Sequence, residues 1–244
     1  MTATTPAIQG VSRRIAGVDW QKAEASLARR GFASIGPLLG ARECARLARV
    51  FSDDSAFRAT VDLERHRFGA AGSYRYFDRP LPPLVEALRR EMYPPLSAIA
   101  NRWQEALRRD ERYPERLVDF LERCEAHDQR RPTPLLLRYH EGGYNCLHQD
   151  RYGDVVFPLQ IVILLDRPEV DFGGGEFLLV EQRPRMQSRG SSIRLTRGHA
   201  VVFPNAERPV QGARGVYRAQ TRHGVSEVTR GMRTTLGIIF HDAS

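Results

Sequence analysis

Hydrophobic residues recur at spacings of three and four through the first half of the chain, which is the period of an amphipathic helix. This pattern predicts helices over residues 18–32, 41–51 and 115–126. Residues 81–110 have the same period but contain Pro94 and Pro95, so two helices divided at these prolines are expected there. The first half is therefore predicted to be mainly helical.

The pattern changes after Pro134 to short hydrophobic runs separated by glycine and proline. Such runs, rich in valine, isoleucine and leucine, predict β-strands. We expect strands over residues 135–139, 144–148, 155–165, 176–180, 192–195, 200–203, 215–223 and 233–240. Helices followed by many short strands predict an α+β fold, with a jelly roll or β-sandwich covered by helices.

The chain shows no internal repeat and no long linker. We therefore expect a single domain over residues 1–244. Residues 1–133 would form its mainly helical N-terminal layer, and residues 134–244 its jelly-roll core.

Residues 57–77, FRATVDLERHRFGAAGSYRYF, fit neither the helical nor the strand period. Arginines are interleaved there with aromatic residues, and such a segment can hold phosphates and stack on bases. Two interpretations stay open: a substrate lid, or a segment that packs the helices onto the sheet. The substrate contacts expected from the first interpretation are Arg58, Arg67, Tyr74, Arg75 and Tyr76, and Arg138, on the strand that leads to the candidate metal site, is a further candidate.

The formal net charge is +8, and Lys22 is the only lysine among the 37 residues that are Lys or Arg. A basic chain favours polyanionic partners, DNA or RNA above all. A GC-rich genome that uses arginine for most cations would give the same bias. The three cysteines are widely spaced and predict neither a disulfide framework nor a thiolate zinc site.

No hydrophobic run approaches the roughly 20 residues that cross a bilayer. The N-terminal residues MTATTPAIQGVSRR also lack the apolar stretch of a signal peptide. We therefore expect a cytoplasmic protein without a membrane partner, and the sequence does not indicate an oligomeric state.

His148 and Asp150 stand one residue apart where a predicted strand ends. Side chains alternate across a strand, so both are expected on one face, where they could hold one metal ion. A pair at this spacing also arises by chance, so a third ligand is required. His223 is the best candidate because it ends another predicted strand and precedes Gly224, which permits a close turn.

Two histidines and one carboxylate, with three positions left open, form the facial triad of non-haem Fe(II) oxygenases. Ten residues beyond His223, Arg233 lies within an apolar strand and needs an anionic partner, because an unpaired buried charge is costly. A dicarboxylate cosubstrate would be such a partner, with Thr235 and Tyr139 as further hydrogen-bond donors. A structural ion pair for Arg233, and a core position for Tyr139, are the alternatives.

Together, Tyr139, His148, Asp150, His223, Arg233 and Thr235 resemble the signature of 2-oxoglutarate-dependent Fe(II) oxygenases. FGGGEFLLVEQ and LTRGHAVVFP resemble the middle of that fold in prolyl hydroxylases, whose His-to-Arg spacing the chain also follows. RYHEGGYNCLHQD is similar to the metal strand of AlkB-like demethylases of alkylated nucleic acid. Taken whole, the chain resembles a bacterial family of these oxygenases presumed to modify nucleic acid.

The resemblance implies a double-stranded β-helix, or jelly roll, that binds Fe(II), 2-oxoglutarate and dioxygen. It implies hydroxylation or oxidative demethylation of a substrate, with modified DNA or RNA ranked first, including a role in DNA repair. A protein side chain ranks second and a small metabolite third. A cupin-like metal-binding protein without enzymatic activity is the alternative from another class.

Overall fold

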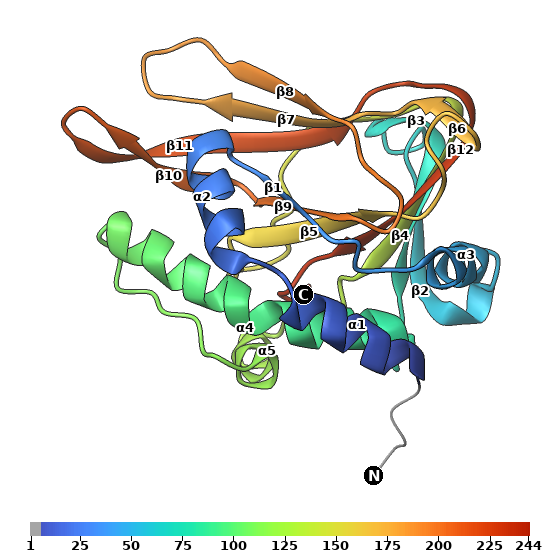
Figure 1. Ribbon diagram of the computed structural model, residues 1–244, viewed down its shortest axis with the longest axis horizontal. Coiled ribbons are helices and arrows are strands. Elements are labelled where there is room, and N and C mark those ends of the chain that lie inside the picture. Colours follow the sequence, from blue (N-terminus) through green and yellow to red (C-terminus); the bar gives the residue numbers. More distant parts are fainter. Residues whose placement is uncertain (1–5) are drawn as a thin grey trace.

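The computed structural model describes residues 6–244, and in this range twelve antiparallel strands form one hydrogen-bonded network that curls into two layers (Figure 1). The strands are β1 (Ala33–Ile35), β2 (Phe57–Asp62), β3 (Gly69–Phe77), β4 (Leu135–His148), β5 (Leu159–Leu164), β6 (Phe172–Gly174), β7 (Phe177–Gln182), β8 (Arg189–Ile193), β9 (Ala200–Pro204), β10 (Glu207–Gly212), β11 (Gly215–Val225) and β12 (Val228–Ile238). The main path runs β1-β9-β5-β12-β4-β11-β7-β8. The predicted jelly-roll core is confirmed.

Five helices are present among the described residues, together with the 3-10 turn η1 (Asp54–Ala56). They are α1 (Pro6–Ala16), α2 (Trp20–Arg30), α3 (Ala41–Val50), α4 (Pro83–Ala106) and α5 (Leu117–Glu125). Figure 1 shows α1, α4 and α5 on the outer side of the layer that contains β5 and β9, opposite the layer of β7, β8 and β11. None of the helices within residues 6–244 has the length and hydrophobicity needed to cross a membrane.

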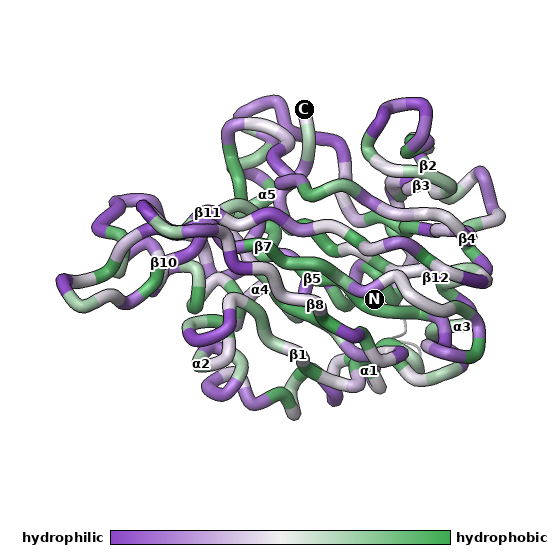
Figure 2. The backbone as a smooth tube through the Cα atoms, turned by 90° about the horizontal axis from the view of Figure 1, so that it is seen from above, coloured by the Kyte–Doolittle hydropathy of each residue, from purple (hydrophilic) through white to green (hydrophobic). Residues whose placement is uncertain are grey.

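Strand β5 is hydrophobic at every position except Gln160, so its sequence does not alternate between hydrophobic and polar residues. Ile161 and Ile163 pack in the core beneath the helices, whereas Val162 and Leu164 pack in the core between the two layers. A strand that is covered on both faces needs mainly apolar residues on both. Figure 2 shows β5 as a mainly hydrophobic segment.

Strand β12 also has one face in the core beneath the helices and the other face between the two layers. This arrangement places polar residues of β12 in the space between the layers. Leu236 and Ile238 belong to the helix-covered core. Arg233 and Thr235 alternate onto the opposite face and line a cavity between the two layers. The register places Arg233 opposite Tyr139 and Thr235 opposite Leu137 on β4. One face of two neighbouring strands therefore carries the residues that the sequence indicated for cosubstrate binding.

The predicted break at Pro94 and Pro95 is wrong, because α4 continues through both. A proline inside a helix costs about 3 kcal/mol or more. Met92, Tyr93 and Leu96 are completely buried beside the prolines. Each large apolar side chain contributes about 1.5–3 kcal/mol on full burial, so this packing offsets the loss of helical hydrogen bonds.

Several other boundaries differ from those expected. Residues 135–148 form one continuous 14-residue strand where two were predicted. Helix α1 and strands β6 and β10 were not predicted at all.

Residues 57–77 contain the hairpin β2–β3. Strand β3 pairs with β4, with Tyr74 opposite Leu137 and Tyr76 opposite Leu135, so the hairpin extends the sheet. The expectation of a mainly helical segment over residues 1–133 is correspondingly too simple, because β1, β2 and β3 all lie in it. The assignment of residues 1–244 to one domain stays a prediction.

Candidate metal and cosubstrate site

A cavity of about 370 Å³ lies between the two layers of strands. Strands β3, β4, β5, β11 and β12 contribute to its wall, together with the loop that follows β4. Its lining includes His148, Asp150 and His223 as well as Arg233 and Thr235. Residues separated by as many as 87 positions in the sequence, His148 and Thr235, thus share one cavity.

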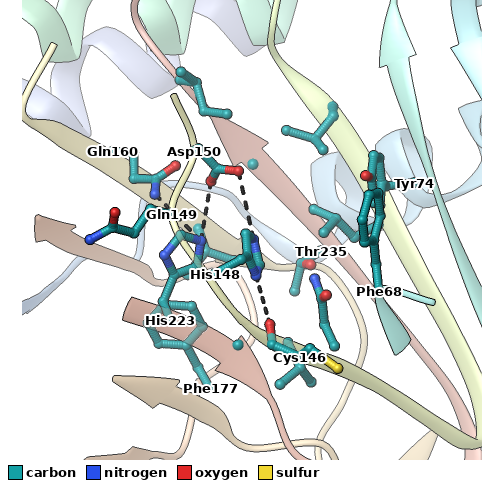
Figure 3. Close-up of a pocket in the computed structure, with 18 of the residues that line it drawn as sticks. Phe68, Tyr74, Cys146, His148, Gln149, Asp150, Gln160, Phe177, His223 and Thr235 are labelled. Atoms are coloured by element: carbon teal, nitrogen blue, oxygen red, sulfur yellow. Dashed lines mark hydrogen bonds and ion pairs between the residues drawn. The ribbon is translucent and has the colours of Figure 1, made fainter. Parts of the chain in front are cut away.

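His148, Asp150 and His223 form a cluster whose possible ligand atoms all lie within 4.8 Å of one another (Figure 3). His148 ends β4 and pairs directly with His223 on β11. The Nε2 atom of His223 lies 3.1 Å from Oδ2 of Asp150, and Nε2 of His148 lies 3.6 Å from Oδ1. Strand pairing therefore brings together the three residues that the sequence suggested.

The hydrogen bond of His148 orients its ring so that Nε2 faces the cluster. Its Nδ1 lies 2.7 Å from the carbonyl oxygen of Cys146, so Nδ1 carries the proton and donates. In the neutral ring Nε2 is then the nitrogen without a proton, which is the form in which an imidazole binds a metal. Burial lowers the pKa of His223 and so favours its neutral form.

Asp150 is held as an anion. Burial by itself would raise the pKa of this carboxyl group, but the hydrogen bond and positive charge that His223 supplies when it is protonated, the charge of a protonated His148 and the hydrogen bond from Tyr152 hold it well below its usual range. Its backbone NH donates to Oδ1 of Asn205 at 3.0 Å, which fixes the chain where β4 ends. One carboxylate beside two imidazoles is a donor set suited to a divalent transition metal.

Arg233 is the least satisfied charge in the cavity. Only 1% of the residue is exposed, and among residues 6–244 none of its Nε, Nη1 and Nη2 atoms has a hydrogen-bond partner. Burial lowers the pKa of the guanidinium, which is the direction expected for a cation that has lost water. A buried cation without a protein counterion indicates a site for an anion from outside the chain.

Groups around Arg233 fit this interpretation. The guanidinium carbon lies 5.6 Å from the ring centre of Tyr139. Burial raises the pKa of Tyr139 to about 12, so its hydroxyl stays protonated, and it accepts a hydrogen bond from Asn145 at 3.3 Å. Gly175 has a φ of +63°, and a Cβ there would meet Cδ of Arg233 at 2.7 Å. Glycine at this position therefore leaves room for the arginine stem.

The arginines and tyrosines predicted to contact substrate divide into two groups. Arg67, Tyr74 and Tyr76 line the cavity, as does Phe68, which is 48% exposed (Figure 3 shows Phe68 and Tyr74). Arg67 is also one of the non-glycine residues with a left-handed backbone, at a φ of 58° in the turn before β3. These four side chains form an aromatic and basic border, here called the hairpin border.

The substrate prediction is wrong for Arg75 and Arg138, which alternate onto the opposite face of the sheet. Arg75 donates to the carbonyl of Phe51 at 2.5 Å and to Asp54 at 2.7 Å. Arg138 donates to the carbonyl of Ala48 at 2.7 Å. Both guanidinium groups anchor the sheet to the end of α3 and the turn after it, and strand alternation leaves them no access to the cavity.

Arg58 does not line the cavity either. It donates to the carbonyl of Pro132 at 2.9 Å, and its guanidinium carbon lies 4.8 Å from the ring centre of Tyr76. A cation above an aromatic face holds the ring by electrostatic attraction. The structure therefore assigns Arg58 a supporting contact behind Tyr76 instead of direct contact with substrate.

Tyr152, beside the cluster, was not predicted from the sequence as a site residue. Tyr152 donates its hydroxyl to Oδ1 of Asp150 at 2.6 Å and lines the cavity. Burial and then the nearby Asp150 carboxylate raise the pKa of Tyr152, so the hydroxyl keeps its proton. Its position two residues after Asp150 was a usable signal, because alternation already suggested a shared face. Gln149, between the two candidate ligands, instead donates to the carbonyls of Thr221 and Ala206 at 2.7 and 3.0 Å.

The jelly roll, the cluster of two histidines and one aspartate and the unpaired arginine define the class of 2-oxoglutarate- and Fe(II)-dependent oxygenases. Residues 72–243 match the model of the Oxygenase-NA family, described as "oxygenase, catalysing oxidative methylation of damaged DNA". The chain belongs to this family. The predicted enzyme class, with iron as its metal and 2-oxoglutarate and dioxygen as cosubstrates, is confirmed.

Two uncharacterized proteins from strains of Mycobacterium tuberculosis are each 48% identical to the chain over 168 residues, which is 69% of this chain and 72% of theirs. Among solved structures, a 2-oxoglutarate-Fe(II) oxygenase family oxidoreductase from Burkholderia pseudomallei superposes with a TM-score of 0.53, 16% identity and 93% coverage of both chains. A prolyl hydroxylase from Trichoplax adhaerens gives a TM-score of 0.52 at 15% identity, covering 99% of this chain and 94% of its own. These likenesses confirm the fold.

Proposed function

We propose that the chain holds Fe(II) through His148, Asp150 and His223, and binds a carboxylate of 2-oxoglutarate at Arg233. We further propose that it oxidises a methyl group on an alkylated base of nucleic acid. The single observation that carries the cosubstrate site is the complete burial of Arg233 without a hydrogen-bond partner among the described residues. A dicarboxylate supplies the missing anion and reaches from it into the same cavity as the cluster.

The three donors fit a ferrous ion. Each residue offers one ligand atom, and these atoms lie within 4.8 Å of one another. The proton on Nδ1 of His148 leaves Nε2 for the metal, and the anionic Asp150 balances part of its charge. Two nitrogen ligands and one oxygen ligand leave three positions for 2-oxoglutarate and dioxygen.

When bound, iron with 2-oxoglutarate and dioxygen supplies a net reaction in which one oxygen atom enters a substrate C–H bond and the other enters succinate, with loss of carbon dioxide. The chain binds and orients the reactants. Arg233 fixes the cosubstrate carboxylate, with Thr235 and Tyr139 beside it as hydroxyl donors. The apolar walls of the cavity, from Leu137 and Val162 among others, exclude water from the reacting groups.

Three observations support a nucleic-acid substrate. The family description names damaged DNA. The net charge of +8 favours a polyanion. The hairpin border of Arg67, Phe68, Tyr74 and Tyr76 provides aromatic faces on which a base can stack and a cation for its phosphate. An N-methyl group that is hydroxylated there breaks down to formaldehyde and the unmodified base, so the proposed outcome is repair.

The alternative is a protein hydroxylase of prolyl type. The ten-residue step from His223 to Arg233 resembles the spacing in prolyl hydroxylases, and a prolyl hydroxylase is among the structural neighbours. Binding of the peptide backbone would then use the same cavity. The charge of the chain gives no reason to prefer a peptide over nucleic acid.

The experiment that tests the proposal measures succinate and formaldehyde released from a panel of substrates. The panel contains N-methylated single-stranded DNA, double-stranded DNA and RNA, their unmethylated counterparts, and proline-containing peptides. We expect both products in equal amounts with a methylated oligonucleotide and neither with His148→Ala. Stimulation by peptides alone, or equal product from His148→Ala, would overturn the assignment.

A further inference from the structure

Tyr152 and Tyr76 connect the Asp150 carboxylate to the hairpin β2–β3 through their hydroxyl groups. The hydroxyl of Tyr76 donates to that of Tyr152 at 3.0 Å, and the hydroxyl of Tyr152 donates to Oδ1 of Asp150 at 2.6 Å. Tyr76 is only 8% exposed, as is Asp150. Donors that point along one chain in a buried setting polarise and strengthen one another.

The two oxygens of Asp150 therefore have different surroundings. Oδ1 accepts the short hydrogen bond from Tyr152 and lies 3.6 Å from Nε2 of His148, whereas Oδ2 accepts no hydrogen bond from Tyr152 and lies closer to its histidine, 3.1 Å from Nε2 of His223. A carboxylate without such a bond can rotate about its last bond or offer both oxygens to one metal ion. A hydroxyl fixed on Oδ1 restricts rotation and leaves Oδ2 as the oxygen for the metal.

Several contacts hold the two tyrosines in place. Their rings meet edge to face with centroids 6.1 Å apart at an angle of 86°. The guanidinium of Arg58 lies over the ring of Tyr76, with its carbon 4.8 Å from the ring centre. Tyr76 also lies opposite Leu135 in the sheet. The hydroxyl chain is thus part of the wall of the cavity.

We propose that Tyr152 is a positioning residue that makes Asp150 a one-oxygen ligand, and that Tyr76 supports it by holding the Tyr152 hydroxyl. This inference rests on the proposed function, in which Asp150 binds the metal. A single oxygen from Asp150 uses one coordination position and leaves three open, whereas two oxygens would leave only two. The hairpin border that faces the substrate then shares a residue, Tyr76, with the support of the metal ligand.

The test measures metal binding directly, without turnover. Tyr152→Phe and Tyr76→Phe each remove one hydroxyl and keep the ring. Mn(II) affinity is measured by calorimetry, and Co(II) binding by its visible absorption, whose intensity reports the coordination number. Loss of a partner that orients a metal ligand typically weakens metal binding about 10–100-fold. We expect at least about tenfold weaker Mn(II) binding and an altered Co(II) spectrum for Tyr152→Phe, with a smaller loss for Tyr76→Phe.

Tyr113→Phe is the matched control. Tyr113 is also buried, and its hydroxyl donates to the carbonyl of Val156 at 3.0 Å in the core beneath the helices. Its variant should lose stability but bind both metals as the wild type does. Because Tyr76 acts through Tyr152, the double variant should bind Mn(II) no more weakly than Tyr152→Phe alone.

The experiment distinguishes failure of the proposed metal site from failure of the proposed role of Tyr152. If the wild type and His148→Ala bind Mn(II) equally, the metal site itself is wrong, and the positioning role falls with it. If the wild type binds Mn(II) far better than His148→Ala, but Tyr152→Phe keeps the wild-type affinity and Co(II) spectrum, only the role of Tyr152 is refuted. A fall in melting temperature alone, equal to that of Tyr113→Phe, would also refute that role.

Discussion

Replacing Arg233 by methionine tests whether the buried arginine serves a ligand or the fold. Without cosubstrate, the guanidinium has no hydrogen-bond partner among residues 6–244 and is 1% exposed. Substituting an apolar residue of similar volume for buried charges is often neutral or stabilises by about 1–4 kcal/mol. For a chain of this length, each kcal/mol corresponds to about 2–4 °C in melting temperature. We therefore expect Arg233→Met to melt at or above the wild-type temperature.

The effect of 2-oxoglutarate should be the opposite. At a concentration of 100 times its Kd, a ligand stabilises the folded state by about 2.7 kcal/mol, which corresponds to about 5–10 °C here. Removing one partner of a buried charge pair costs about 3–5 kcal/mol, or about two to four orders of magnitude in affinity. The shift with 2-oxoglutarate should therefore appear in the wild type and disappear in Arg233→Met.

The assay is a thermal melt with Mn(II), with and without 2-oxoglutarate, and Arg208→Met is its control. Arg208 is also 1% exposed, but its Nε donates to Glu181 at 2.6 Å. Its replacement should lower the melting temperature and keep the cosubstrate shift, because it removes the more deeply buried of the two arginines that pair with Glu181 and the hydrogen bond to the carbonyl of Ala28. The reasoning would be refuted if Arg233→Met lost as much stability as Arg208→Met, or if it kept the shift.

Three further predictions concern other parts of the molecule. Burial alone would raise the pKa of Glu181, but hydrogen bonds and charges from neighbouring arginines hold it below the ordinary value of a glutamate. Its stabilisation is therefore fully present above the pKa of the unfolded chain and is lost as the pH falls through the lowered pKa, so acid titration of unfolding should show a flatter profile for Glu181→Gln. Gly175→Ala should weaken 2-oxoglutarate binding by about tenfold, as measured by calorimetry. The new Cβ would displace the side chain of Arg233, and alanine in a left-handed backbone conformation is strained by about 1–2 kcal/mol. An unchanged affinity would contradict this prediction. Phe68→Ala should raise the KM for a methylated oligonucleotide about tenfold without changing the Kd for 2-oxoglutarate, because base stacking contributes about 1–3 kcal/mol per base; an equal effect on both constants would count against a substrate contact.

The residues of the candidate site were predictable because strand alternation is a local rule and because their spacing matches the oxygenase signature. His148 and Asp150 were expected on one face, and β4 and β11 place His148 directly opposite His223. Alternation likewise separated Arg233 and Thr235 from the apolar face of β12. Alternation needed only the period of a strand, which does not depend on distant contacts. The pairing of His148 with His223 joins strands 75 residues apart, and the sequence indicated it only through the spacing of the oxygenase signature.

Features that depend on distant contacts were not predictable in this way. Whether Arg75 and Arg138 face substrate or α3 is decided by the sheet face they occupy and by carbonyls on a helix far away in sequence. Strand β10 was not predicted because Pro209 has no amide hydrogen to donate to a neighbouring strand. The structure pairs β10 with β11 alone, so it is an edge strand, where a missing amide hydrogen is tolerated.

Anaerobic addition of Fe(II) and 2-oxoglutarate, followed by visible absorption, tests the central claim most directly. If His148, Asp150 and His223 hold iron while Arg233 holds the cosubstrate beside it, the wild type should show a metal-to-ligand charge-transfer band that saturates at one 2-oxoglutarate per chain. His148→Ala should show no band, and Arg233→Met should need about two to four orders of magnitude more 2-oxoglutarate. A wild-type protein without the band, or variants that titrate like the wild type, would contradict the account.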